Sequence, residues 1–178
     1  GGLCVFKNKL YATSLYKPAG FFRYDGEHRW TACEVPHVSS QQSPGESTAM
    51  RVEAIAPCNG ALYATCYDGG RVFRFDGEHW TACGQLGDNT QTYSLAVLAG
   101  QLYVGTWPSG KVYRFAGLNQ WIDAGRLGEE LEVMGMLVHN GRLIGGTLPL
   151  AEVYQFDGQS RWDKLTRLDH TPDVRYRR

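Results

Sequence analysis

The sequence of 178 residues has no long apolar run and no excess of charge of either sign. No stretch approaches the ~20 consecutive apolar residues that a helix needs to cross a bilayer, so we expect no membrane partner. Its 18 basic and 18 acidic residues cancel, and a chain without a net positive field is poorly suited to bind nucleic acid. The composition favours a soluble globular domain that binds neither nucleic acid nor membrane.

Cysteine is scarce and odd in number, with five residues. Five thiols cannot all pair within one chain, and Cys4, Cys58 and Cys66 fall in or beside apolar segments, which indicates buried structural thiols. Cys33 and His37 form one close Cys/His pair, but without a second pair they do not define a zinc site. We therefore expect no metal and no cofactor, and the localisation stays open.

Helical periodicity is also absent, and the sequence instead repeats one pattern four times. Each repeat holds a short segment that begins with Leu, then a polar break, an aromatic-rich run and a Trp. The leading residues are Leu10, Leu62, Leu102 and Leu143, so successive repeats are spaced by 52, 40 and 41 residues. Spacings of ~40 to 50 residues are typical of repeat architectures in which each repeat is one small sheet.

Turn dipeptides divide each repeat into four short strands, lettered A to D in chain order. Asn59-Gly60 is expected to turn the chain between strands A and B, and Asp76-Gly77 between strands C and D, because these pairs tolerate the positive φ of tight hairpins. In the third repeat the strands are expected at 95–98, 102–105, 112–115 and around 121–123. The sequence thus predicts an all-β unit spanning 1–178, with four-stranded antiparallel blades at approximately 1–51, 52–91, 92–132 and 133–178.

The strands are apolar on both faces, so each sheet needs a neighbour on either side. Small residues in strand B are expected to let neighbouring blades approach closely. They are Ala12, Ala64, Gly105 and Gly146. A Trp recurs at the head of strand D, and we interpret this set as packing residues of the outer blade. Its members are Trp30, Trp80, Trp121 and Trp162.

On these residues the chain resembles the β-propeller superfamily, and its blade rhythm resembles kelch-type and sialidase-like bacterial propellers. The likeness covers all 178 residues, although no family fingerprint is complete, since the Ser-x-Asp-x-Gly-x-Thr-Trp box of sialidases is absent. Three arrangements stay open: a complete four-blade ring, half of an eight-blade dimer, and a fragment of a larger propeller. Further propeller blades or a homo-oligomer are therefore expected partners.

The resemblance implies that the face carrying the D–A and B–C connections holds the binding site. At the first position of strand A, three repeats carry Arg51, Gln91 and Glu132, which we expect to form a polar ring that holds a ligand by charge-assisted hydrogen bonds. The B–C loops supply the remaining predicted ligand-binding residues. They are Tyr16, Lys17, Tyr67, Asp68 and Trp107.

Trp107 departs from the repeat, because it is the one Trp outside strand D. Its flat ring suits stacking on a sugar or anchoring a protein partner. The first D–A connection carries an insertion, 35–50, which is either a tolerated surface loop or a lid over the central mouth.

The favoured function is a non-catalytic binding platform, lectin-like or protein-binding, with a glycan or a protein as partner and no catalytic residue. One alternative is a glycoside-processing enzyme, with Glu132 or Asp68 as acid/base and Glu129 and Glu130 as the next candidates, which requires two carboxylates ~5 to 9 Å apart. The other alternative is a structural repeat scaffold in a larger assembly.

Overall fold

The computed structural model describes residues 1–16, 19–39 and 47–169, and these form strands and turns. Four antiparallel four-stranded sheets follow one another along the chain, each with its strands in sequential order. The prediction of an all-β fold built from such blades is confirmed. In the described part of the chain, no helix is long and apolar enough to cross a membrane.

The four blades share one layout, with strands A to D in chain order. Blade 1 consists of β1 (Leu3–Phe6), β2 (Lys9–Ser14), β3 (Gly20–Gly26) and β4 (Arg29–Cys33). Blade 2 consists of β7 (Val52–Cys58), β8 (Ala61–Cys66), β9 (Arg71–Phe75) and β10 (Trp80–Gln85). Blade 3 consists of β11 (Gln91–Leu98), β12 (Gln101–Trp107), β13 (Lys111–Gly117) and β14 (Gln120–Arg126). Blade 4 consists of β15 (Glu132–His139), β16 (Arg142–Leu148), β17 (Glu152–Phe156) and β18 (Trp162–Arg167).

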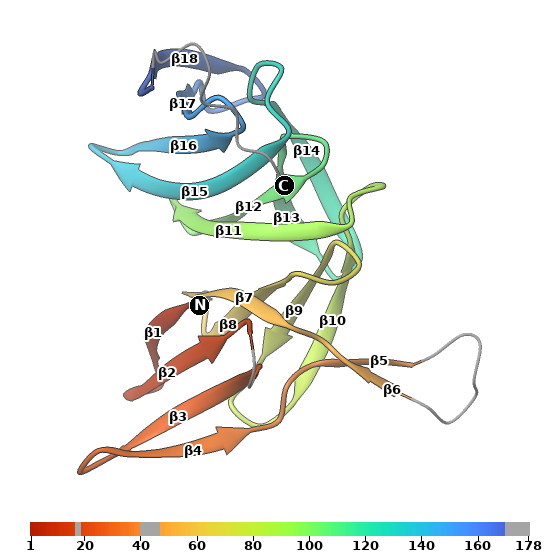
Figure 1. Cartoon of the computed structure of the whole chain (residues 1–178), viewed down its shortest axis with the longest axis vertical. Helices are drawn as coiled ribbons and strands as arrows, with labels where there is room; N and C mark the ends of the chain where they lie inside the picture. The colour runs from red at the N-terminus through yellow and green to blue at the C-terminus, as the bar shows by residue number, and fades with distance from the viewer. Residues whose placement is uncertain (17–18, 40–46, 170–178) are drawn as a thin grey trace.

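The blades fan out from a common centre. Figure 1 shows the A strands β1, β7, β11 and β15 on the inner side and the D strands β4, β10, β14 and β18 on the outer side. Consecutive blades are in contact, since β7 packs beside β1 and β2, β11 beside β7 and β8, and β15 beside β11 and β12. Blades 1 and 4 lie at the two ends of this arc (Figure 1).

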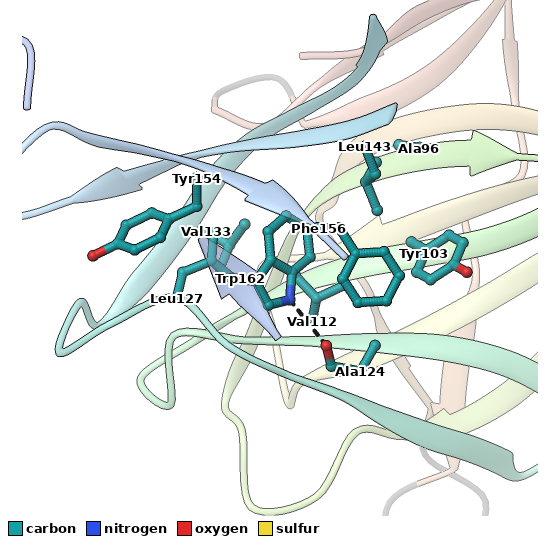
Figure 2. Packing of buried hydrophobic residues seen from close by; sticks show 10 residues of the cluster. All are labelled: Ala96, Tyr103, Val112, Ala124, Leu127, Val133, Leu143, Tyr154, Phe156 and Trp162. Carbon is teal, nitrogen blue, oxygen red and sulfur yellow. Dashed lines mark hydrogen bonds between the residues drawn. The ribbon is translucent and has the colours of Figure 1, made fainter. Parts of the chain in front are cut away.

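Apolar clusters fill each junction between blades. Figure 2 shows the junction of blades 3 and 4, where Leu127 and Val112 of blade 3 pack with Val133, Phe156 and Trp162 of blade 4. Similar clusters join blades 1 and 2 and blades 2 and 3. The stability of each blade therefore depends on its neighbours, because one sheet alone cannot bury both of its apolar faces.

The register corrects the predicted set of small strand B residues. Ala12 pairs with Phe22 and Ala64 with Phe73. Gly105 pairs instead with Val112 and Gly146 with Val153, so both glycines stand one position further along their strands. Gly105 has a different role, because a Cβ there would lie 2.3 Å from the Ser94 hydroxyl. This glycine makes room for a hydroxyl that donates to the next blade, to Val133 O at 2.8 Å.

Strand A of the third blade is longer than expected. It runs from Gln91 to Leu98 and not from 95 to 98, because a register shift between Thr92 and Leu95 lets pairing continue toward the loop face. The first residues of this strand are polar, so a prediction from apolar runs places its start too late.

The insertion in the first D–A connection contains a short hairpin, β5 (His37–Ser39) with β6 (Ser47–Ala49). Figure 1 shows these two strands extending outward, away from the inner A strands. Its base is anchored, since Val38 packs against a cluster of Met50, Cys66 and Phe73. None of the described residues of this insertion lines the central opening described below.

Candidate ligand-binding hollow

All four blades contribute to one opening at the centre of the arc, which we call the central hollow. It has a volume of about 530 Å³. Its lining comes from the end of β2 and the following loop, from β7, from the loop after β8, and from β11 and β15. The lining residues are Gly1, Thr13, Ser14, Leu15, Tyr16, Glu53, Tyr67, Tyr93 and Met134.

Three tyrosines dominate the wall of the central hollow. Tyr16 is largely exposed and presents an open ring. Tyr67 meets Tyr93 edge to face, with ring centroids 6.1 Å apart and an interplanar angle of 89°. Tyrosine rings offer flat apolar surface together with a polar edge, which is the combination that binds amphipathic ligands.

Tyr67 is held in place by an ion pair beside it. The Arg51 guanidinium lies 4.4 Å from the centroid of the Tyr67 ring, and it donates to both carboxylate oxygens of Asp68, with Nε to Oδ2 at 3.0 Å and Nη2 to Oδ1 at 2.5 Å. Hydrogen bonding to Arg51 lowers the pKa of Asp68. Asp68 is therefore ionised and paired at neutral pH, which fits a positioning role better than that of a general acid.

Glu53 is the one acidic residue among those that line the hollow. Its Oε2 is buried and has no hydrogen-bond partner among the residues that the structure describes. Burial raises the pKa of Glu53, and the nearby Glu132 carboxylate adds to the rise, while the amino group at the start of the chain opposes it. A buried carboxylate oxygen without a donor is costly, so this site is suited to a ligand that brings a hydrogen-bond donor.

Sequence reasoning missed Glu53. The corresponding positions of the other blades carry Gly1, Tyr93 and Met134, all of which line the same hollow. A single acidic residue at a position that is otherwise uncharged was the signal available in the sequence. Apolar periodicity alone does not distinguish this position.

The three residues of the predicted polar ring, Arg51, Gln91 and Glu132, lie at equivalent positions of their blades, but none of them lines the hollow. Gln91 pairs with Trp107 and Glu132 with Leu148, while the Tyr67 N–H donates to Arg51 O at 3.0 Å. Glu132 is buried, not at a solvated rim. The Gln91 side chain accepts a hydrogen bond from the Tyr93 hydroxyl and so supports the wall from behind.

The other predicted binding residues are dispersed. Trp107 ends β12, is half-buried, and lies outside the lining of the hollow. Lys17 lies outside the described residues. The structure thus brings Tyr16 and Tyr67 to one opening, with Arg51 and Asp68 next to them.

Glu129 and Glu130 lie apart from the hollow, at the connection between blades 3 and 4. Glu130 is buried, and its Oε2 accepts the Thr147 hydroxyl at 2.8 Å and the Leu150 N–H at 3.0 Å. The Glu129 side chain is exposed and lies 3.5 Å from Arg126. We call the Glu130 contacts the blade 4 corner, since they tie the D–A connection to the B–C loop of blade 4.

The described part of the chain contains no preformed metal site. Within residues 1–16, 19–39 and 47–169, no group of three or more His, Cys, Asp or Glu side chains is placed to hold an ion. The five cysteines are all free thiols.

No family model matches the chain, and no curated protein sequence matches it significantly. Solved structures of propeller-like proteins do. A catalytically inactive virginiamycin B lyase from Staphylococcus aureus, solved with quinupristin, is 12% identical with a TM-score of 0.73, over 96% of this chain and 56% of the lyase.

Two further structures are similar. A gluconolactonase from Xanthomonas campestris is 14% identical with a TM-score of 0.64, over 92% of this chain and 60% of that chain. YCF48 bound to D1 peptide is 17% identical with a TM-score of 0.55, over 92% of this chain and 51% of that chain. This chain spans little more than half the length of these proteins. At such identities the likeness concerns the fold alone, and the fold is that of a β-propeller.

Proposed function

We propose that the central hollow binds a small carbohydrate and that the chain acts as a non-catalytic binding platform. The observation that carries this proposal is the buried, unpartnered Glu53 carboxylate oxygen in a wall of tyrosines. A sugar presents hydroxyl donors on its edges and apolar C–H groups on its faces. The first complement Glu53 and the second complement the ring of Tyr16.

The hollow is also of a suitable size. Its volume of about 530 Å³ lies within the ~300 to 1,000 Å³ range of small-molecule sites. The adjacent Arg51–Asp68 pair is internally neutral, so Glu53 and the nearby Glu132 give the region a negative character. A neutral polyol or a cationic sugar suits this field better than an acidic one.

Retention on a panel of immobilised mono- and oligosaccharides tests the proposal. We expect Tyr16→Ala to weaken retention about five- to thirtyfold, since loss of a stacking ring removes about 1 to 2 kcal/mol. The ring of Tyr16 is exposed, so this substitution leaves the fold intact. Trp107→Ala is the comparison, since the half-buried Trp107 lies outside the hollow. A panel without any bound sugar, or equal loss in both variants, would argue against this site.

A second candidate, an enzyme acting in the same hollow, is favoured by one observation. The raised pKa of Glu53 is what a general acid needs, and Glu132 is the neighbouring carboxylate. Among the similar structures are a lyase and a gluconolactonase. Turnover of a retained sugar or lactone by the wild type, lost in Glu53→Gln while retention persists, would establish this candidate in place of the first.

A further inference from the structure

A single rule joins every pair of consecutive blades. The strand D Trp of the following blade donates its indole N–H to a backbone carbonyl of the preceding blade. Trp80 donates to Glu34 O at 2.8 Å, Trp121 to Cys83 O at 2.8 Å and Trp162 to Ala124 O at 2.9 Å. Figure 2 shows the last of these bonds inside the apolar cluster between blades 3 and 4.

Blade 1 carries the donor half of this rule on a face that no other described blade covers. Trp30 pairs with Tyr24 as Trp80 pairs with Phe75, so it holds the equivalent place in its blade, yet it is 45% exposed. Leu3 on β1 is 66% exposed, whereas its counterpart on β7, Ile55, is buried in the cluster between blades 1 and 2. The exposed face of blade 1 therefore resembles the faces by which blades 2, 3 and 4 pack on the blade before them.

Blade 4 carries the acceptor half on a face that no other described blade covers. Three residues beyond the strand D Trp, Cys83 and Ala124 are buried under the next blade, whereas Leu165 is 53% exposed. Six residues beyond that Trp, Leu86 and Leu127 are fully buried, whereas Leu168 is 72% exposed. The exposed face of blade 4 therefore resembles the faces that blades 2 and 3 present to the blade after them.

The blade 4 face also has room for side chains of a partner. An apolar depression of about 320 Å³ lies between Met134, Gly146 and Leu168. At the place of Gly146, blades 1 and 2 carry Thr13 and Thr65, whose hydroxyls donate to the next blade at Glu53 O and Tyr93 O. The glycine leaves this part of the blade 4 face open and apolar.

We propose that these two faces join between two copies of this chain, with blade 1 of one copy packing on blade 4 of the other. The Trp30 indole then donates to the Leu165 carbonyl of the second copy, and Leu3 and Leu168 become buried. A second copy fits because one chain carries both complementary halves, and its 18 basic and 18 acidic residues create no net repulsion between copies.

Two such contacts related by a twofold axis form an eight-blade ring, a size that propellers adopt. In this ring both apolar faces are buried. Exposed apolar patches of this kind typically mark protein–protein contacts. The second copy also faces the open side of the central hollow. The contact itself does not rest on the proposed carbohydrate binding, so either can fail alone.

Sedimentation velocity of the full chain over a wide concentration series tests the contact. We expect a dimer for the wild type and a monomer for the double variant Leu165→Asp with Leu168→Asp. The matched control is Leu118→Asp, in the C–D turn of blade 3, which is 52% exposed but lies on neither end face. It should remain dimeric. Because all three leucines are exposed, circular dichroism should show unchanged folding.

A second variant examines the hydrogen bond itself. Trp30→Phe keeps the ring but removes the indole donor at both contacts of the dimer, and we expect a dimer dissociation constant about four- to hundredfold higher, the effect of two hydrogen bonds. Larger assemblies dissolved by the double variant would also support the contact, since blades joined head to tail without closure form a chain. A wild-type monomer at every concentration, or an assembly that survives the double variant, overturns the proposal.

Discussion

The blade 4 corner and the central hollow each contain a carboxylate oxygen withdrawn from water, yet the two are in opposite states. Glu130 Oε2 accepts from the Thr147 hydroxyl and the Leu150 N–H, whereas Glu53 Oε2 has no partner among the described residues. A satisfied buried carboxylate stabilises the loops around it, and an unsatisfied one lowers stability. Burial alone therefore does not assign a role to an acidic residue, and the donors around it do.

Removing Glu130 should have the largest effect on stability. Glu130→Ala leaves a buried hydroxyl and a buried N–H without their acceptor, so we expect the free energy of unfolding to fall by about 2 to 4 kcal/mol. Urea denaturation measures it. Glu129→Ala is the matched control, because that neighbour is exposed and should change stability by less than about 0.5 kcal/mol. Equal free energies of unfolding for the two variants would show that the contacts of the blade 4 corner do not stabilise the fold.

Replacing Glu53 should weaken binding without lowering the stability of the fold. Glu53→Gln keeps the shape but removes the charge, and we expect the affinity for a retained sugar to fall about tenfold, or about 1.4 kcal/mol. The free energy of unfolding should stay equal or rise, since an unpaired buried charge is removed. Titration calorimetry and urea denaturation give the two values. Glu78→Gln, exposed in a C–D turn, is the control for loss of one negative charge.

The Arg51–Asp68 pair should contribute a smaller amount. Both side chains are partly exposed, so Asp68→Asn should lower the free energy of unfolding by at most about 1 kcal/mol. Since the pKa of Asp68 is lowered in the folded chain, this stabilisation is present above its ordinary value of 3.8 and disappears as pH falls through the folded-state pKa. Wild type and variant should therefore converge in stability at acid pH. A gap that widens there would contradict this assignment.

The pH dependence of Glu53 should run in the opposite direction. Its pKa is raised by burial, so the unfolded chain releases this proton first as pH rises from the ordinary value of 4.5. The wild type should lose stability relative to Glu53→Gln across the interval between 4.5 and the folded-state pKa. Thermal unfolding at a series of pH values measures the difference. Parallel curves for the two proteins would indicate that Glu53 is solvated.

The architecture was predictable because the same pattern of strands and turns recurs in each of the four repeats. Pairs such as Asn59-Gly60 at an A–B turn fix where strands reverse, and the recurring Trp marks strand D. The predicted equivalence of Gly105 and Gly146 with the alanines was wrong, because the repeat pattern alone does not reveal a shift of one position. Ser94 supplies from strand A the hydroxyl that Thr13 and Thr65 supply from strand B, and only the register reveals this exchange.

The position of the central hollow beside the B–C loops was predictable from the sequence, but only some of its lining residues were. Placing it beside the B–C loops pointed to Tyr16 and Tyr67, which both line the hollow. Trp107 was singled out as an exception to the repeat, but the structure holds it against Gln91 at the end of β12. Glu53 was missed because its significance lies in the absence of a donor near it, which depends on neighbouring strands that the sequence does not place.

The most direct test of the central claim is the thermal unfolding of the wild type and of Glu53→Gln with and without a sugar retained from the panel. A ligand that binds only the folded chain raises its stability in proportion to the logarithm of its concentration. We predict a rise in midpoint for the wild type that grows with sugar concentration and is much smaller for Glu53→Gln. An equal rise in both proteins would contradict the account, because the ligand would then bind without the Glu53 carboxylate.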